Sequence, residues 1–334
     1  MTRSIADVVI PFGGSADDDP VGGTKVPEAL RRVMELCKQK ERPKPNEVRN
    51  EAHYQLYERL RQLFNKIEES SSVGDDVVDE YAAALQEFWR ILDSDEGKTV
   101  VERLLNLDNV SKSIADVHND VKKLFGKIGL ETGDLVGWEA LNETGRDKVR
   151  SALESIVKSA GSLGNELREV NDQLSALELI NDEVKKMDNQ KSKLPETTRN
   201  ALRKAQNALE KHHLKDHSVP ETPEWFISEN DTSFKEGSFA AVYFGDLRVD
   251  TKVVVKVLKS DGSNMDVKRA IEKEASTLSK LRHVNIVRMV GANHACTLPF
   301  IVMEHATNGN VSEYLKQSPE NLNKRWKLLH EAAT

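Results

Sequence analysis

The chain has 334 residues, a net charge of −7 at neutral pH and 38% hydrophobic residues, with a mean hydropathy of −0.55. These values predict a polar, soluble protein of two or three domains, and the negative charge argues against a general nucleic-acid-binding protein. Because aromatic residues make up only 5% of the chain, the composition favours long amphipathic helices over a compact β-rich core.

The chain begins with a polar segment, residues 1–25, which is rich in Gly, Asp and Ser and is expected to be disordered. Its short apolar stretch does not resemble a signal peptide, and no run approaches the ~20 apolar residues of a membrane span. The two cysteines, Cys37 and Cys296, are too far apart in sequence to suggest a disulfide framework. We therefore expect a cytoplasmic protein with no transmembrane segment.

Residues 26–132 predict a helical bundle. Apolar residues recur at helical spacing over Glu47–Glu69, Val77–Leu92 and Val110–Ile128. Short loops containing Ser, Asp or Gly separate these segments. Several amphipathic helices with short connections are typical of a bundle.

Residues 133–213 are expected to form long helices that brace the bundle. A near-heptad rhythm of apolar residues from Leu163 to Met187 predicts one long helix, which is either a brace or one strand of a coiled coil. A shorter helix is expected over Ala201–His213. Residues 214–224 contain two prolines and are predicted to be an interdomain linker.

The hydrophobic pattern changes period from Trp225 onward, where short β-branched and aromatic runs replace the helical spacing. Two further helices are expected near the end of the chain, over Val311–Gln317 and Leu322–Ala333. The expected strands are Phe234–Gly237, Ala241–Leu247, Thr251–Leu258, Ile286–Val290 and Phe300–Glu304, with a helix over Val267–Leu281 between the third and the fourth.

A carboxylate occupies the apolar stripe of the helix expected at Val267–Leu281. Glu274 shares this stripe with Ile271 and Leu278, so packing of the helix would bury its charge. A buried carboxylate is costly unless it is paired. Lys256, which follows three valines on the preceding strand, is the nearest candidate cation, and we expect the two to form an ion pair.

The order of these elements resembles the small lobe of a protein kinase, in which a strand lysine pairs with a helix glutamate. The style of the match is similar to the tyrosine-kinase-like group, whose members mostly phosphorylate serine and threonine. The segments that carry the resemblance are Gly237–Tyr243 (the glycine-rich loop), Val253–Lys256, Glu274, Leu281–Val287 with Val284 in place of the usual proline, Phe300–Ala306 (the fifth strand and hinge) and Gly309–Leu315.

This resemblance implies that ATP is the cofactor. Lys256 would hold the ATP phosphates and Glu274 would hold Lys256, so these two are the candidate catalytic residues. Met303 would be the gatekeeper, and the backbone of the residues after it would meet adenine. The full set of implied ATP-binding residues is Lys235, Gly237, Ser238, Phe239, Ala240, Val242, Val254, Lys256, Met303, Glu304, His305, Ala306 and Gly309.

The chain also departs from the kinase pattern. Of the three glycines usual in the loop only Gly237 is present, because Lys235 and Ala240 take the other two positions. The triplets His-Arg-Asp, Asp-Phe-Gly and Ala-Pro-Glu do not occur, so the substrate-orienting aspartate and the ligands of Mg²⁺ are missing from the sequence. We expect a fragment that stops before the catalytic loop and is inactive alone.

The helical half is weakly similar in layout to the four-helix domain and brace of the mixed-lineage kinase-like pseudokinase. Related helical domains occur in plant immune receptors and fungal incompatibility proteins, and residues Gly97–Ile128 carry most of the likeness. The likeness implies that the bundle would control self-association, bind protein partners or contact membranes.

The predicted architecture is a multi-domain chain. An all-α bundle with brace helices is followed at residues 225–334 by an α+β kinase small lobe, with a five-stranded antiparallel sheet and one main helix, and by a truncated large lobe. The leading function is an ATP-dependent protein Ser/Thr kinase regulated by its helical domain, with a protein substrate that the sequence does not identify. The alternatives are a pseudokinase switch that binds nucleotide, and a helical scaffold with a vestigial kinase segment.

Overall fold

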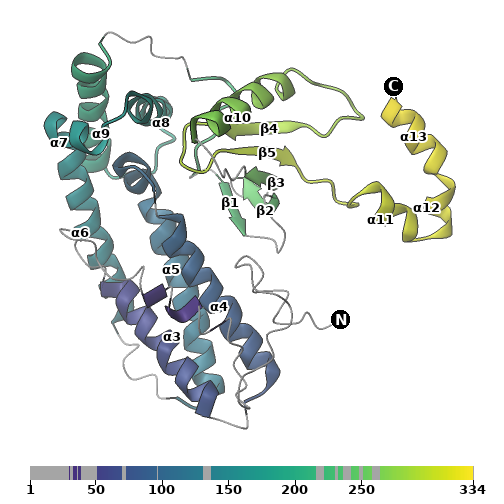
Figure 1. Cartoon of the computed structure of the whole chain (residues 1–334), viewed down its shortest axis with the longest axis horizontal. Coiled ribbons are helices and arrows are strands. Elements are labelled where there is room, and N and C mark those ends of the chain that lie inside the picture. The colour runs from purple at the N-terminus through teal and green to yellow at the C-terminus, as the bar shows by residue number, and fades with distance from the viewer. Residues whose placement is uncertain are drawn as a thin grey trace. The chain divides into compact units, whose positions relative to one another are not determined.

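The computed structural model describes residues 30, 33–35, 37–38, 51–69, 73–95, 97–130, 137–215, 222–229, 232–235, 242–247, 251–257 and 264–333 (Figure 1). The disorder predicted for residues 1–25 lies outside the described residues. By its internal contacts the chain divides into two compact units, Met1–Val219 and Pro220–Thr334. Each unit is described by itself.

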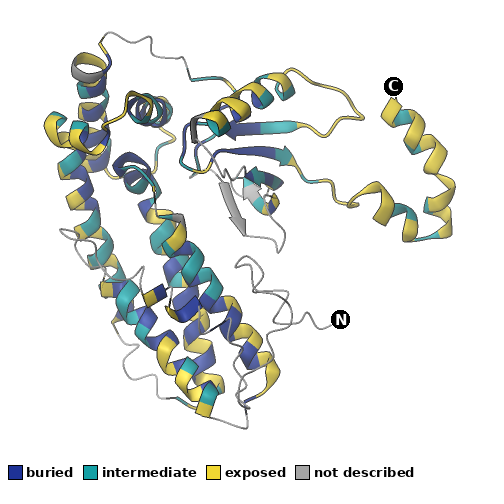
Figure 2. Cartoon of the chain, viewed as in Figure 1, coloured by how far each residue is buried: buried dark blue, intermediate teal, exposed yellow. Residues whose placement is uncertain are grey.

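The first unit contains a bundle of amphipathic helices. Helices α3 (Glu51–Glu69), α4 (Asp75–Ser94) and α5 (Val100–Lys127) each bury an apolar stripe and expose a charged one (Figure 2). The described core also takes in Leu30, Val33, Met34, Cys37 and Trp138. Its largest fully buried side chains are Tyr81, Phe88, Leu30, Leu56, Leu60, Leu63, Ile67, Leu85, Ile114 and Leu124.

Helix α5 begins ten residues before the first apolar residue of the expected segment, Val110. A capping box fixes its start: the Thr99 hydroxyl accepts a hydrogen bond from the Glu102 amide, and the Glu102 carboxylate accepts one from the Thr99 amide at 2.9 Å. These two bonds satisfy amide groups that the first turn of a helix leaves without partners. Together with the apolar residues after Thr99, they extend the helix to 28 residues.

An aromatic and cationic contact joins three parts of the bundle. The His118 ring on α5 stacks on the Trp138 ring at the start of α6 (Trp138–Lys158), with centroids 3.9 Å apart and planes 3° apart. Arg59 Nη1 on α3 lies 2.9 Å from His118 Nδ1. Because a guanidinium only donates, Nδ1 is the acceptor and the imidazole is neutral. Burial, with the nearby charges of Arg59 and Lys122, lowers the pKa of His118 to about 4.

The single long helix predicted from Leu163 to Met187 is wrong. The chain forms α7 (Ala160–Glu166) and α8 (Val170–Asp188), separated at residues 167–169. Two glycines in α7 weaken its helical preference, and Gln173 Nε2 donates to the Leu167 carbonyl at 2.7 Å, which stabilises the break. Helix α9 (Glu196–Ala208), which follows α8 in the first unit, continues into a π-helical turn, Leu209–His213.

The second unit is built on an antiparallel sheet with the strand order β1-β2-β3-β5-β4. Helix α10 (Asn264–Leu278) packs against β4 and β5, as Figure 1 shows in green. This is the arrangement expected of a kinase small lobe. The strands are β1 (Thr232–Lys235), β2 (Val242–Leu247), β3 (Thr251–Val257), β4 (Met289–Asn293) and β5 (Phe300–Glu304). Side chains are described for most residues of β2, β3, β4 and β5.

The fourth strand starts three residues later than the predicted Ile286. Residues 283–286 form a turn instead, in which the Ile286 amide donates to the His283 carbonyl at 3.1 Å. At the other end of β4, Ala292 exchanges two backbone hydrogen bonds of 2.9 Å with Trp225 and Ile227. The position of β4 is therefore set by β5 on one side and by Trp225 and Ile227 on the other, and not by the β-branched residues alone.

Two helices replace the one predicted over Leu322–Ala333. After α11 (Val311–Lys316) come α12 (Pro319–Asn323), which is capped by Lys324, and α13 (Arg325–Ala333). Trp326 on α13 is 69% exposed, and these three helices contain no buried residue. None of the helices among the described residues combines the length and apolar content that a membrane crossing requires.

Candidate functional site

The predicted ion pair between β3 and α10 is formed. Lys256 Nζ donates a hydrogen bond to Glu274 Oε1 at 2.9 Å. The two side chains are 44% and 38% exposed, so the expectation that α10 buries Glu274 is wrong. An ion pair this exposed adds at most about 1 kcal/mol to stability. Its main consequence is positional, because it fixes where the Lys256 ammonium lies.

The apolar stripe predicted on α10 is also narrower than expected. Ile271 and Ala275 are buried against the sheet, whereas Leu278 is only half-buried. Leu281 lies beyond the end of the helix and is exposed. Glu274 is therefore at the border of the buried stripe, where it can reach Lys256 and still contact solvent.

Strand β3 divides its side chains between the two faces of the sheet. Val253, Val255 and Val257 are buried in one apolar cluster. Val254 and Lys256 alternate with them and lie on the opposite face, which α10 covers in part. Lys256 therefore lies on a strand whose other face is fixed by packing.

The register of the strands places further predicted residues on the Lys256 face. Val242 of β2 is opposite Lys256, and Met303 of β5 is opposite Val254. Directly opposed residues of an antiparallel pair project from the same face. Val242 is 44% exposed and Met303 is half-buried, so apolar side chains surround the lysine on this face.

The end of β5 is held against the residue that precedes β4. The Glu304 amide donates to the Arg288 carbonyl, and the Arg288 amide donates to Glu304 Oε1, both at 3.0 Å. A turn follows in which the Gly309 amide donates to the Ala306 carbonyl at 3.2 Å, with Gly309 at φ 71°. Among the described residues, no hydrogen bond from the amide of His305 or Ala306 is seen.

Not every predicted site residue can be located. Gly237, Ser238, Phe239 and Ala240 lie outside the described residues. The Lys235 backbone pairs with Phe244 at the end of β1, and its side chain is not described. The structure brings together Val242, Val254, Lys256, Glu274 and Met303 on one face. Glu304 ends β5, and His305, Ala306 and Gly309 follow it in the chain.

Sequence reasoning missed two residues of this region. Arg288 holds Glu304, the last residue of β5, through its backbone, which no side-chain pattern predicts. Phe244 of β2 is opposite Val254 and therefore lies on the Lys256 face. Its ring contacts the His305 ring, with centroids 5.2 Å apart and planes at 79°. The alternation of β2 from Val242 was the available signal for Phe244.

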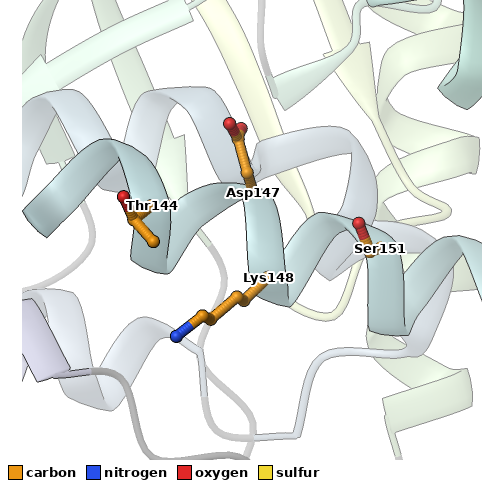
Figure 3. Close-up of a pocket in the computed structure, with 4 residues that line it drawn as sticks. All are labelled: Thr144, Asp147, Lys148 and Ser151. Carbon is orange, nitrogen blue, oxygen red and sulfur yellow. The ribbon is translucent and has the colours of Figure 1, made fainter. Parts of the chain in front are cut away.

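A hollow along α6 offers no comparable chemistry. It is lined by Thr144, Asp147, Lys148 and Ser151, all exposed and all on one helix (Figure 3). In the close-up the Asp147 and Lys148 side chains point to opposite sides of the helix. Across the part of the chain that the structure describes, no group of three or more His, Cys, Asp or Glu is arranged to hold a metal ion.

The sequence of the second unit is similar to protein kinases. Residues 229–333 match the family model described as "Protein tyrosine and serine/threonine kinase". The chain is 30% identical over 108 residues to tyrosine-protein kinase Fer of Homo sapiens, and 33% identical over 98 residues to the receptor-like serine/threonine-protein kinase ALE2 of Arabidopsis thaliana. It is also 30% identical over 118 residues to fibroblast growth factor receptor 1 of Pleurodeles waltl.

These matches involve only part of each protein. They cover 31%, 29% and 31% of this chain for Fer, ALE2 and the growth factor receptor, and 13%, 13% and 14% of the relatives. Both tyrosine and serine/threonine kinases are among them. The matches therefore support a protein-kinase-like segment at residues 229–333, without deciding whether such a segment would serve a tyrosine or a serine/threonine kinase.

Proposed function

We propose that this chain binds ATP on the face of the sheet that carries Lys256, with Lys256 contacting the phosphates and Glu274 orienting Lys256. The observation that carries the proposal is the 2.9 Å ion pair between Lys256 Nζ and Glu274 Oε1. A cation held at a fixed position by a carboxylate is suited to a phosphate chain, because the lysine side chain has already lost its conformational entropy before the phosphates bind.

The neighbouring residues fit the rest of the nucleotide. Val242 and Val254 offer an apolar surface on the same face, which suits a planar base. The amides of His305 and Ala306 are donors at the end of β5 that a base could use. Met303 lies between these two features as the proposed gatekeeper, and Gly309 shapes the turn that follows. Lys235 and the segment Gly237–Ala240 are proposed to cover the phosphates.

Transfer of the γ-phosphoryl group needs more than this site. It requires Mg²⁺ ligands and a group that orients the substrate hydroxyl, and neither His-Arg-Asp nor Asp-Phe-Gly occurs in these 334 residues. Among the described side chains around Lys256, the one carboxylate is Glu274, which is paired to Lys256, and the others are apolar. Such a set does not supply the oxygen ligands that Mg²⁺ requires. We therefore propose ATP binding for this chain, and phosphorylation of serine or threonine in a protein substrate only together with a large lobe that supplies those groups.

The second candidate is a nucleotide-binding switch without phosphoryl transfer, in which the helical unit responds to occupancy of the site. The departures of the glycine-rich segment, Lys235 and Ala240 in place of glycines, favour it. A helical scaffold whose kinase segment binds nothing is the remaining possibility. Regulation, self-association and protein partners of the helical unit belong to these proposals.

Calorimetric titration of the full chain with ATP tests the leading proposal. Saturable binding that Lys256→Met weakens roughly 10- to 100-fold supports it, and unchanged binding in that variant contradicts the assignment of the site. Sedimentation of the same samples with and without ATP separates the candidates. Self-association that depends on ATP favours the switch, and self-association in a chain that does not bind ATP favours the scaffold.

A further inference from the structure

The face that carries Lys256 also carries a row of apolar side chains nearer the end of β5. Phe244 of β2 is opposite Val254 of β3, which is in turn opposite Met303 of β5. These three residues form a row across three strands. The row containing Lys256 is the next one on this face. It lies two residues further along β3, so the two rows are about 7 Å apart.

The direction of the strands decides which end of a nucleotide would meet each row. Strand β5 runs from Phe300, opposite Val257, to Glu304, opposite Val253. The row of Phe244 is therefore closer than Lys256 to the segment that follows Glu304. If Lys256 binds the phosphates, the base and ribose lie at the row of Phe244.

The Phe244 ring is held in place without being covered. It makes an edge contact with His305, at a centroid distance of 5.2 Å, within the range of stabilising aromatic pairs. The residue nevertheless remains 62% exposed. A mainly exposed aromatic residue beside two half-buried apolar residues is a surface that a planar, partly apolar group can cover.

We propose that Phe244 contacts the nucleoside part of the bound nucleotide and that His305 positions the Phe244 ring for this contact. The inference rests on the proposed function, because it takes Lys256 as the phosphate-binding residue. It assigns to Phe244 a share of the affinity that comes from the base and ribose, whereas Lys256 contributes the share that comes from the phosphates.

Titration calorimetry with adenosine, ATP and inorganic tripolyphosphate tests this division on the full chain. In Phe244→Ala we expect the Kd values of adenosine and ATP to rise by the same factor, roughly 3- to 10-fold. The affinity for tripolyphosphate stays unchanged. Phe244→Tyr keeps the ring and restores both nucleoside affinities. Lys256→Met gives the opposite pattern, with ATP and tripolyphosphate weakened and adenosine retained.

The matched control is Trp326→Ala, which removes another mainly exposed aromatic ring away from this face and leaves all three affinities unchanged. Wild-type adenosine affinity in Phe244→Ala, alongside weakened ATP in Lys256→Met, overturns this inference and leaves the proposed function standing. A wild-type chain that does not bind ATP overturns both.

The positioning role of His305 has its own readout. His305→Ala keeps the backbone amide and removes the ring that contacts Phe244. We expect a smaller loss of adenosine affinity than in Phe244→Ala, and no additional loss when the two substitutions are combined. Losses that add fully in the double variant overturn the positioning role.

Discussion

Lys256 on β3 and Glu274 on α10 are 18 positions apart in the sequence, and their side chains meet at 2.9 Å. The strand fixes one partner and the helix the other: the valines on either side of Lys256 are buried beneath β3, and Ile271 and Ala275 anchor α10. Both charges remain partly in water. The pair is therefore a weak contributor to stability and a strong determinant of where a positive charge lies on this face.

The first prediction concerns the cation. Lys256→Met should remove the stabilisation that ATP gives to the chain, because an apolar side chain cannot contact the phosphates. Loss of a charge-assisted contact of this kind costs about 1.5–3 kcal/mol, or roughly 10- to 100-fold in Kd. Lys252→Met is the matched control, since Lys252 lies on the same strand about 13 Å from Lys256. Thermal shift and calorimetry with ATP measure the effect.

The second prediction separates position from stability. Glu274→Gln should change the free energy of unfolding by less than about 1 kcal/mol, because the ion pair is partly exposed. The same substitution should weaken ATP binding several-fold, because the Lys256 ammonium is no longer held. Glu272→Gln, at an exposed position of the same helix, should change neither quantity. Equal ATP affinity in the two variants would contradict a positioning role for Glu274.

The third prediction concerns pH and the first unit. The pKa of His118 is lowered from 6.5 to about 4 by burial and by neighbouring positive charges. Between these values the unfolded chain binds a proton that the folded chain does not, so the free energy of unfolding falls as the pH falls from 6.5 to about 4. Below pH 4 this histidine adds no further loss.

His118→Gln tests that slope. Glutamine does not titrate, yet its oxygen can still accept from Arg59. Urea unfolding followed by circular dichroism should show a shallower pH dependence in this variant, by about 1.4 kcal/mol per pH unit within the window. Part of the slope should remain, because burial lowers the pKa of His53 on the same unit to about 4. An unchanged slope would rule out a contribution from His118. His330→Gln, at an exposed position outside this unit, serves as the control.

The fourth prediction compares two glycines. A Cβ at Gly291 in β4 would collide with the Ile227 side chain and lie 2.7 Å from the Trp225 carbonyl oxygen. Gly291→Ala should therefore destabilise the second unit by roughly 1–3 kcal/mol. Gly126→Ala, in α5 with nothing within 4 Å of the new Cβ, should instead stabilise the first unit by about 0.5–1 kcal/mol. Differential scanning calorimetry follows both units, and effects of the same sign would contradict the prediction.

Local patterns were sufficient for the elements that bury a continuous face. The β-branched run around Lys256 predicted β3, and the helical spacing of apolar residues predicted α3 and α4. Glu274 on an otherwise apolar stripe predicted the partner of Lys256, because an unpaired carboxylate at such a position is costly. Each of these inferences needs only the side chains of one element and the cost of burying a charge.

The tertiary structure decided what depends on contacts between distant segments. The break at Leu167 is stabilised by Gln173, and β4 begins at Met289 because the preceding residues form a turn while Trp225 and Ile227 pair with Ala292. The sequence pattern of one segment contains no information about these partners.

The same distinction holds at the site. The sequence alone predicted that Lys256 and Glu274 would meet, although its premise that Glu274 is buried was wrong. Only the tertiary structure decided that both stay partly exposed and that the Phe244 ring contacts His305. The physical reason is that strand register and the path of the chain after β5 fix which side chains from separate elements become neighbours.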